Sequence, residues 1–336
     1  MAVKKSMDIS TPNAIAKAKE SLLLYLNNCE GKKATVSEIE DALQLSQVNT
    51  FKIIKELEQE ENILKSDKWY LPTPKEDYID WNGNLKHAIK LYNMKIPTLF
   101  IGDKGSGKTR CTEEVAKEVG TTLDTINLSL RCRESHILGR LDIKESKKGV
   151  QEVTWLKGPL PRSMEAGNIL YLDELSAGEP DVLLRLDEAL DDRRQLSYEG
   201  ITINAHPNWW CTASINPLTT PGTKELPPQL ISRFTARLYF AYPPNDIEMR
   251  IIRTHVPTLK TRNGMSKVLQ YFSKLRGNDA LPYSPSLRES ILFARLLMEG
   301  YDIPETLEIV AFNPLHHWNS DVYDIAREHA QSMELI

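Results

Sequence analysis

The sequence contains no apolar run that approaches the length of a membrane-spanning helix. Its first residues, 1–6, also lack the apolar segment of a signal peptide. The four cysteines include no C-x-x-C pair, which argues against a disulfide framework or a zinc site and favours free thiols in a reducing compartment. These absences predict a soluble, cytoplasmic protein. The cysteines are Cys29, Cys111, Cys132 and Cys211.

An excess of positive charge is also missing. The chain carries 42 Lys and Arg against 46 Asp and Glu, a formal net charge of −4. This balance gives no reason to expect a general attraction to nucleic acid or to anionic membranes. The length of 336 residues is sufficient for two or three domains.

One glycine-rich stretch matches the pattern G-x-x-x-x-G-K-[ST] between an apolar run and a helix-like run. Its glycines let the backbone fold tightly, so that N–H groups and the following helix dipole can point at phosphate oxygens. Lys108 would add charge at the outer phosphates, and the Thr109 hydroxyl would hold Mg²⁺. An ordinary turn is the alternative, but the strand and helix context favours a nucleotide-binding loop. The predicted binding residues are Gly102, Asp103, Lys104, Gly105, Ser106, Gly107, Lys108, Thr109 and Arg110.

Apolar runs alternate with helical patterns after residue 78, which predicts an α/β core with a parallel five-stranded sheet covered on both faces. The carboxyl ends of such strands should carry the functional residues beside the phosphate loop. The expected strands are 98–101, 123–128, 169–172, 209–214 and 236–240.

The third of these runs ends in two carboxylates, Asp173 and Glu174. Asp173 would hold the Mg²⁺ shell, and Glu174 would orient and deprotonate the attacking water. A solvated acidic pair at a strand end is the alternative interpretation. The position downstream of a phosphate loop favours the catalytic one.

Two further polar residues follow the later strands. Asn216 could hydrogen-bond the γ-phosphate and the water, although an Asn before Pro is also a turn signal. Arg233 has no obvious partner nearby in the sequence, so a neighbouring subunit's Arg233 could neutralise charge on the γ-phosphate. A surface arginine is the alternative, and the rival candidates are Arg193, Arg194 and Arg237.

The first seventy residues predict a small α+β domain. Helical patterns cover 12–26, 35–45 and 48–57, with Ser37 and Ser46 as N-caps of the second and third, and 63–71 reads as a hairpin. This order resembles a winged helix. Residues 1–70 contain ten lysines, no arginine and eleven acidic residues, which favours protein contact or support of an oligomer over binding to duplex DNA.

The strand-end carboxylates, Asn216 and the stretch Leu230-Ile231-Ser232-Arg233-Phe234 together resemble an AAA+ ATPase. A narrower resemblance, to the CbbQ/NorQ-like members of the MoxR branch, rests on three other stretches. The phosphate loop departs from the Gly-Pro-Pro-Gly-Thr-Gly-Lys-Thr usual in that branch, and the front domain is not part of the usual core. The three stretches are 139–160, 186–196 and 206–209.

This resemblance implies a helical lid after the core, in which Arg288 reaches the phosphates; a solvated helix residue is the alternative for Arg288. Lid helices are expected over 246–256, 265–275, 286–298 and from 321, with His316 and His317 as surface or packing residues. The expected domains are 1–72 (winged-helix-like), 73–80 (linker), 81–243 (core, with a hairpin insert at about 138–160) and 244–336 (lid).

The resemblance also implies ATP and Mg²⁺ bound between subunits of a ring, expected to be a hexamer, that remodels a partner protein. ATP is favoured over GTP because the sequence has no N-K-x-D motif. MoxR-like proteins typically act with a von Willebrand A domain, whose D-x-S-x-S signature fails here at Pro12, so that domain would be supplied in trans. Two alternatives stay open, a DNA-handling ATPase and a non-hydrolysing, nucleotide-gated scaffold.

Overall fold

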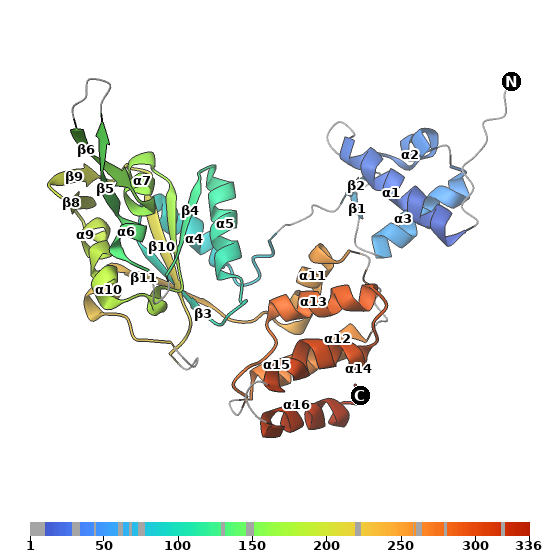
Figure 1. The fold of residues 1–336 in the computed structure, drawn as a ribbon. Helices are drawn as coiled ribbons and strands as arrows, with labels where there is room; N and C mark the ends of the chain where they lie inside the picture. The colour runs from blue at the N-terminus through green and yellow to red at the C-terminus, as the bar shows by residue number, and fades with distance from the viewer. Residues whose placement is uncertain are drawn as a thin grey trace. The chain divides into compact units, whose positions relative to one another are not determined.

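The chain forms two compact units, Met1–Glu76 and Asp77–Ile336, and each is described by itself. Their boundary falls inside the expected linker 73–80, of which 73–77 lie outside the described residues, as do Cys29, His317 and the stretch 8–10. The computed structural model describes residues 11–28, 34–43, 45–59, 63–66, 69–72, 78–128, 132–145, 151–218, 223–257, 259, 264–278, 281–316 and 320–336 (Figure 1).

Within its described residues, the N-terminal unit contains three helices followed by a two-stranded antiparallel sheet. Its core is built from apolar residues at helical spacing, such as Ala18, Leu22 and Leu26 on the first helix, all of which are fully buried. The elements are α1 (Pro12–Asn28), α2 (Val36–Leu43), α3 (Gln47–Gln59), β1 (Ile63–Ser66) and β2 (Trp69–Pro72).

Capping residues set where α2 and α3 begin. The prediction that Ser37 caps α2 is wrong, because Thr35 takes that place. Glu38 Oε2 accepts the Thr35 backbone N–H at 2.7 Å, and Thr35 Oγ1 accepts the Glu38 N–H at 3.4 Å. Ser46 was expected to cap α3, and its Oγ accepts the Asn49 N–H at 3.3 Å.

The larger unit is organised around a five-stranded sheet of order β11-β3-β10-β7-β4, in which every neighbouring pair is parallel. Parallel pairing needs crossover connections, and helices or longer segments provide them. The strands are β3 (Thr98–Gly102), β4 (Leu123–Asn127), β7 (Ile169–Asp173), β10 (Trp210–Ile215) and β11 (Ala236–Phe240). The predicted parallel α/β core is therefore confirmed.

Side chains alternate between the two faces of this sheet. Phe100 and Trp210 are buried against α4 (Asn84–Met94) and α5 (Lys108–Val119), whereas Leu170 packs on the opposite face (Figure 1). The opposite face is covered by α6 (Glu134–Ile137), α7 (Pro159–Ala166), η2 (Leu175–Ala177), α8 (Pro180–Leu183), η3 (Leu184–Leu186), α9 (Asp187–Leu190) and α10 (Pro228–Arg233).

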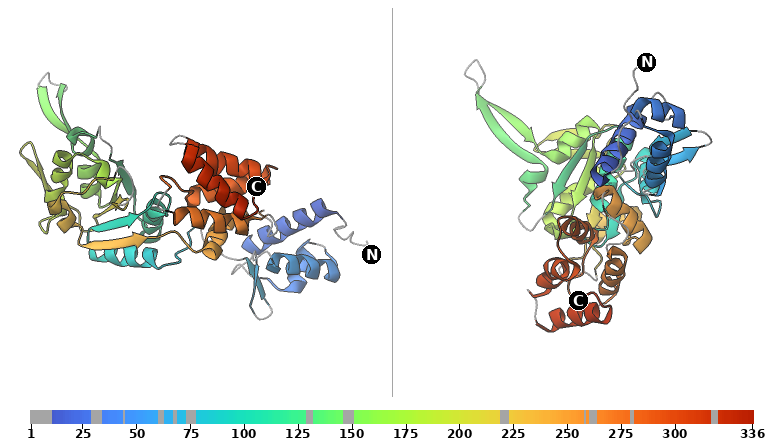
Figure 2. Two further views of the ribbon diagram at one scale, coloured as in Figure 1. Left: turned by 90° about the horizontal axis from the view of Figure 1, so that it is seen from below. Right: turned by 90° about the vertical axis from the view of Figure 1, so that its right-hand side faces the viewer.

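Two antiparallel hairpins are attached to the core. β5 (Gly139–Glu145) and β6 (Gln151–Lys157) form the ribbon that extends away from the sheet in Figure 2, where the hairpin insert was expected. Residues 146–150, which connect the two strands in the sequence, lie outside the described part. β8 (Gln195–Tyr198) and β9 (Ile201–Asn204) form a second hairpin that the sequence analysis did not predict.

Helices follow the sheet in the chain (Figure 2). They bury a separate apolar cluster that includes Phe272, Phe293 and Phe312. Within it lies a buried ion pair, in which both Arg276 amino groups contact Glu248 at 2.6 and 2.9 Å. No helix in the described ranges is long and apolar enough to cross a membrane. The elements are α11 (Asn245–His255), α12 (Met265–Arg276), α13 (Leu287–Met298), α14 (Ile303–Leu307), η4 (Glu308–Phe312), α15 (Asn313–His316) and α16 (Ser320–Ser332).

The buried pair generates a stability prediction. Glu248→Ala leaves a guanidinium that is only 7% exposed without its carboxylate, so the free energy of unfolding should fall by about 3–5 kcal/mol. Urea titration followed by far-UV circular dichroism measures the loss. Lys267→Ala is the matched control because its partner Glu334 is 90% exposed, and it should cost less than about 1 kcal/mol. Equal losses in the two variants would contradict the prediction.

Candidate active site

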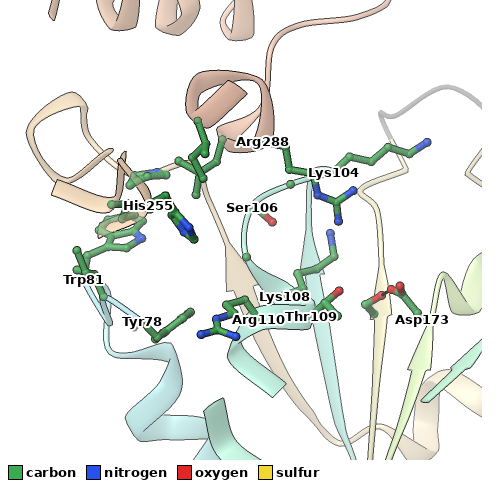
Figure 3. A pocket seen from close by; sticks show the side chains of 18 of the residues that line it. Tyr78, Trp81, Lys104, Ser106, Lys108, Thr109, Arg110, Asp173, His255 and Arg288 are labelled. Carbon is green, nitrogen blue, oxygen red and sulfur yellow. Dashed lines mark hydrogen bonds between the residues drawn. The ribbon is translucent and has the colours of Figure 1, made fainter. Parts of the chain in front are cut away.

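The glycine-rich loop connects the end of β3 to the start of α5 at the carboxyl edge of the sheet (Figure 3). Gly105 and Gly107 adopt φ values of +71° and +95°, which side chains rarely tolerate. A Cβ on Gly105 would also lie 2.3 Å from Oγ of Ser286, the residue that caps α13. The loop therefore approaches the start of α13 too closely for a larger residue at position 105. Successive N–H groups in such a loop form a concave site for anions.

Lys108 is the buried cation of this loop, with 8% exposure. Its Nζ donates to the carbonyl oxygens of Gly102 at 2.6 Å and Asp103 at 2.8 Å, and lies 3.4 Å from Asn216 Oδ1. Burial lowers the pKa of Lys108 to about 8, although the nearby Asp173 opposes this shift. The structure thus brings together the lysine and the amide that the sequence analysis assigned to the outer phosphates.

The Tyr171 hydroxyl links Thr109 to Asp173, and the Ser214 hydroxyl also contacts Asp173; neither hydroxyl group was predicted from the sequence. The Tyr171 hydroxyl lies 3.2 Å from Thr109 Oγ1 and 3.0 Å from Asp173 Oδ1. Ser214 Oγ donates to the same carboxylate oxygen at 2.7 Å. Oxygen donors of this kind suit Mg²⁺, so the two residues predicted to hold that ion fit it chemically.

Glu174 follows Asp173 directly and has φ = +54°, an uncommon conformation for a residue with a side chain. Its N–H donates to Ser214 Oγ at 3.2 Å, which helps to hold the turn. Strained residues of this kind gather at functional sites. The Glu174 side chain lines the same cavity as Lys108 and Asn216.

The loop forms one wall of a cavity of about 430 Å³, a volume suited to a nucleotide-sized ligand. Arg288 enters it from α13 above the loop (Figure 3). Gly102 and Asp103 are not among the lining residues, so their described contribution is the carbonyl support of Lys108. Loop residues 104–110 line the cavity together with Tyr78, Ile79, Trp81, Asp173, Glu174, Ser214, Ile215, Asn216, Pro243, Ile251, Thr254, His255, Leu287, Arg288 and Ile291.

Aromatic and apolar residues at one end of this cavity were not predicted. Tyr78 and Trp81 come from the segment before α4, and His255 comes from α11 (Figure 3). Ile251 of α11 also lines the cavity. Such a surface suits a flat base, while the loop suits phosphates. No sequence motif marks these four residues, because they come from separate segments.

Arg233 lies outside this cavity, and its partner is distant in the sequence. Its Nε and one amino group donate to the two Asp187 carboxylate oxygens at 2.7 and 3.0 Å, which lowers the pKa of Asp187. Arg233 lines a second cavity of about 370 Å³ with Pro97 and Trp210, near the strand starts.

The rival arginines are also engaged elsewhere. Arg193 pairs with Asp191 at 2.6 Å, Arg194 donates to the Trp209 carbonyl at 2.6 Å, and Arg237 donates to the Ile231 carbonyl at 3.5 Å. None of the three lines the phosphate-loop cavity. Within the described residues, no three His, Cys, Asp or Glu side chains group as a metal site.

The pKa of Lys108 generates a pH prediction. Above about pH 8 the nucleotide-free lysine loses its proton and must regain it to bind phosphate. The dissociation constant for ATP should therefore rise roughly tenfold between about pH 7.5 and about pH 9, and stay flat below. Anisotropy of a fluorescent ATP analogue measures it. A Lys108→Ala control should lose this dependence, and a pH-independent wild-type affinity would refute the prediction.

Residues 97–234 match the family model of the AAA domain, dynein-related subfamily. The chain is 34% identical over 145 residues to an uncharacterised Staphylococcus haemolyticus protein, covering 42% of this chain and 55% of that protein, about half its length. It is 31% identical over 191 residues to an uncharacterised Staphylococcus aureus protein, covering 56% of this chain and 72% of that protein. A solved candidate ATPase from Cytophaga hutchinsonii is 17% identical, with 94% and 97% covered and a TM-score of 0.44. The chain therefore contains an AAA domain of the dynein-related subfamily over residues 97–234.

Proposed function

We propose that this protein is a ring-forming, Mg²⁺-dependent ATPase of the MoxR type that remodels a partner protein. The observation that supports this proposal most directly is that one cavity is lined by Lys108, Thr109, Asp173, Glu174 and Asn216. These residues supply a cation, a hydroxyl, two carboxylates and an amide, which are the groups that phosphoryl transfer to water requires.

Each group has a distinct task in this proposal. Lys108 exchanges its two carbonyl contacts for phosphate oxygens, while Asn216 orients the γ-phosphate and the attacking water. Glu174 accepts the proton of that water. When bound to Thr109, Asp173 and the phosphates, Mg²⁺ would neutralise charge on the β- and γ-oxygens.

The location of Arg233 supports a ring, expected to be a hexamer. Arg233 does not line its own chain's phosphate cavity, and it is 37% exposed. A phosphate from a neighbouring subunit would compete with Asp187 for the same planar guanidinium. The guanidinium would then stabilise the charge that develops during hydrolysis in the adjacent subunit.

The surface of α3 supports a protein partner over duplex DNA. Val48 and Phe51 are 78% and 49% exposed, so an apolar patch lies on the helix that would enter a DNA groove. An apolar patch of this kind suits a protein surface, whereas DNA affinity depends largely on cations against phosphates. The proposed partner is of the von Willebrand A type, bound in trans.

Mixing two inactive variants tests the assignment in trans. Glu174→Gln and Arg233→Ala rings should each lose at least about 100-fold in ATP turnover, while both still bind ATP. Mixed rings should regain turnover, because an Arg233→Ala subunit keeps Glu174 and receives Arg233 from its neighbour. Turnover and particle mass are measured together, and Arg237→Ala, measured in the same way, tests a rival candidate that should keep its turnover.

The same assay separates the alternatives. No recovery on mixing, or full turnover by a monomeric Arg233→Ala variant, would refute the inter-subunit role. Unchanged turnover in Glu174→Gln would identify a scaffold that does not hydrolyse ATP. Strong stimulation by duplex DNA at low salt would favour a DNA-handling ATPase over the remodelling of a protein.

A further inference from the structure

A chain of hydrogen bonds links the phosphate loop to the end of β7 through Tyr171. The tyrosine side chain is fully buried and lies on the sheet face that packs against α5, because its neighbours Leu170 and Leu172 point to the other face. Its hydroxyl lies 3.2 Å from Thr109 Oγ1 and 3.0 Å from Asp173 Oδ1. One phenol oxygen therefore contacts both residues that would hold Mg²⁺.

The chemistry of these groups determines which oxygen donates and which accepts in each of these hydrogen bonds. An ionised carboxylate only accepts, so Tyr171 and Ser214 both donate to Asp173 Oδ1. A tyrosine phenol carries its proton at neutral pH, so Tyr171 has one proton to donate. Since the Tyr171 proton is directed at Asp173, the hydrogen bond to Thr109 is donated by the threonine hydroxyl.

Because of these donor and acceptor roles, both residues that would hold Mg²⁺ keep an oxygen atom available to the ion. Thr109 directs its proton toward Tyr171, which leaves its lone pairs available to a cation. Asp173 receives two hydroxyl protons on Oδ1, at 3.0 and 2.7 Å, which fixes the carboxylate and leaves Oδ2 available. A phenylalanine would fill the same apolar position in β7, so packing alone does not call for the Tyr171 hydroxyl.

We propose that Tyr171 is a positioning residue for Mg²⁺, which orients Thr109 and Asp173 without contacting the ion. This inference rests on the proposed Mg²⁺-dependent ATPase function. Partners that orient metal ligands typically change metal affinity by about 10–100-fold when they are removed. The Tyr171 hydroxyl contributes to Mg²⁺ binding but not to nucleotide binding in the absence of the ion.

Tyr171→Phe tests the proposal because it removes only the hydroxyl. The affinity of the full chain for a fluorescent, non-hydrolysable ATP analogue is measured in EDTA and across an Mg²⁺ titration. The half-saturating Mg²⁺ concentration should rise at least about tenfold, whereas affinity in EDTA should stay unchanged. Tyr271→Phe is the matched control, since this fully buried tyrosine donates to the Ala326 carbonyl at 2.8 Å, outside the cavity.

Ser214→Ala provides a second variant that keeps the test valid if Tyr171→Phe does not fold. It removes the other donor to Asp173 Oδ1 and should weaken the Mg²⁺ response in the same direction. If Tyr171→Phe loses nucleotide affinity equally with and without Mg²⁺, or loses none in either condition, the proposed role of Tyr171 is wrong. The proposed ATPase function would not be affected by that result. A wild-type protein whose nucleotide affinity ignores Mg²⁺ would overturn the Mg²⁺ dependence of the proposed function as well.

Discussion

Parallel pairing of β3, β10 and β7 is the constraint on which the site depends. Because the strands run in one direction, their carboxyl ends meet at one edge of the sheet, and the residues that follow them are neighbours in space. The loop after Gly102, the carboxylates at Asp173 and Glu174, and Asn216 come together for this reason. The same pairing places the region that holds Arg233, just before β11, near the strand starts.

Much of this arrangement could be predicted from the sequence, because it depends on local patterns. Apolar runs fixed the five strands to within a residue or two, and the glycine spacing identified the loop. Residues whose roles depend on tertiary contacts escaped prediction. Nothing near Arg233 in the sequence indicates Asp187, 46 residues away, and Trp81 and His255 approach each other only after the chain folds.

Tyr171 shows why such residues are missed. In an apolar strand, a tyrosine reads as core, and only the alternation of faces in the folded sheet shows that its hydroxyl reaches Thr109. The role of Ser214 was equally hard to predict, because no sequence pattern distinguishes a serine near a strand end that binds Asp173 from one that does not. The Ser37 error has a local cause: Glu38 completes a capping box with Thr35, which outcompetes a serine two residues later.

The region after β11 also contacts the phosphate loop and completes the wall of the cavity. Tyr242 donates to the Lys104 carbonyl at 2.7 Å, and its ring lies 4.4 Å from the Arg276 guanidinium. Arg276 is in turn fixed by Glu248, which is fully buried. A buried ion pair costs desolvation that a well-packed apolar pair avoids, so its presence is poorly explained by stability alone. The ion pair is also connected to the phosphate loop, because Arg276 packs on the Tyr242 ring and Tyr242 binds the Lys104 carbonyl. A movement of Arg276 or Glu248 would therefore change the position of the loop backbone near Lys108.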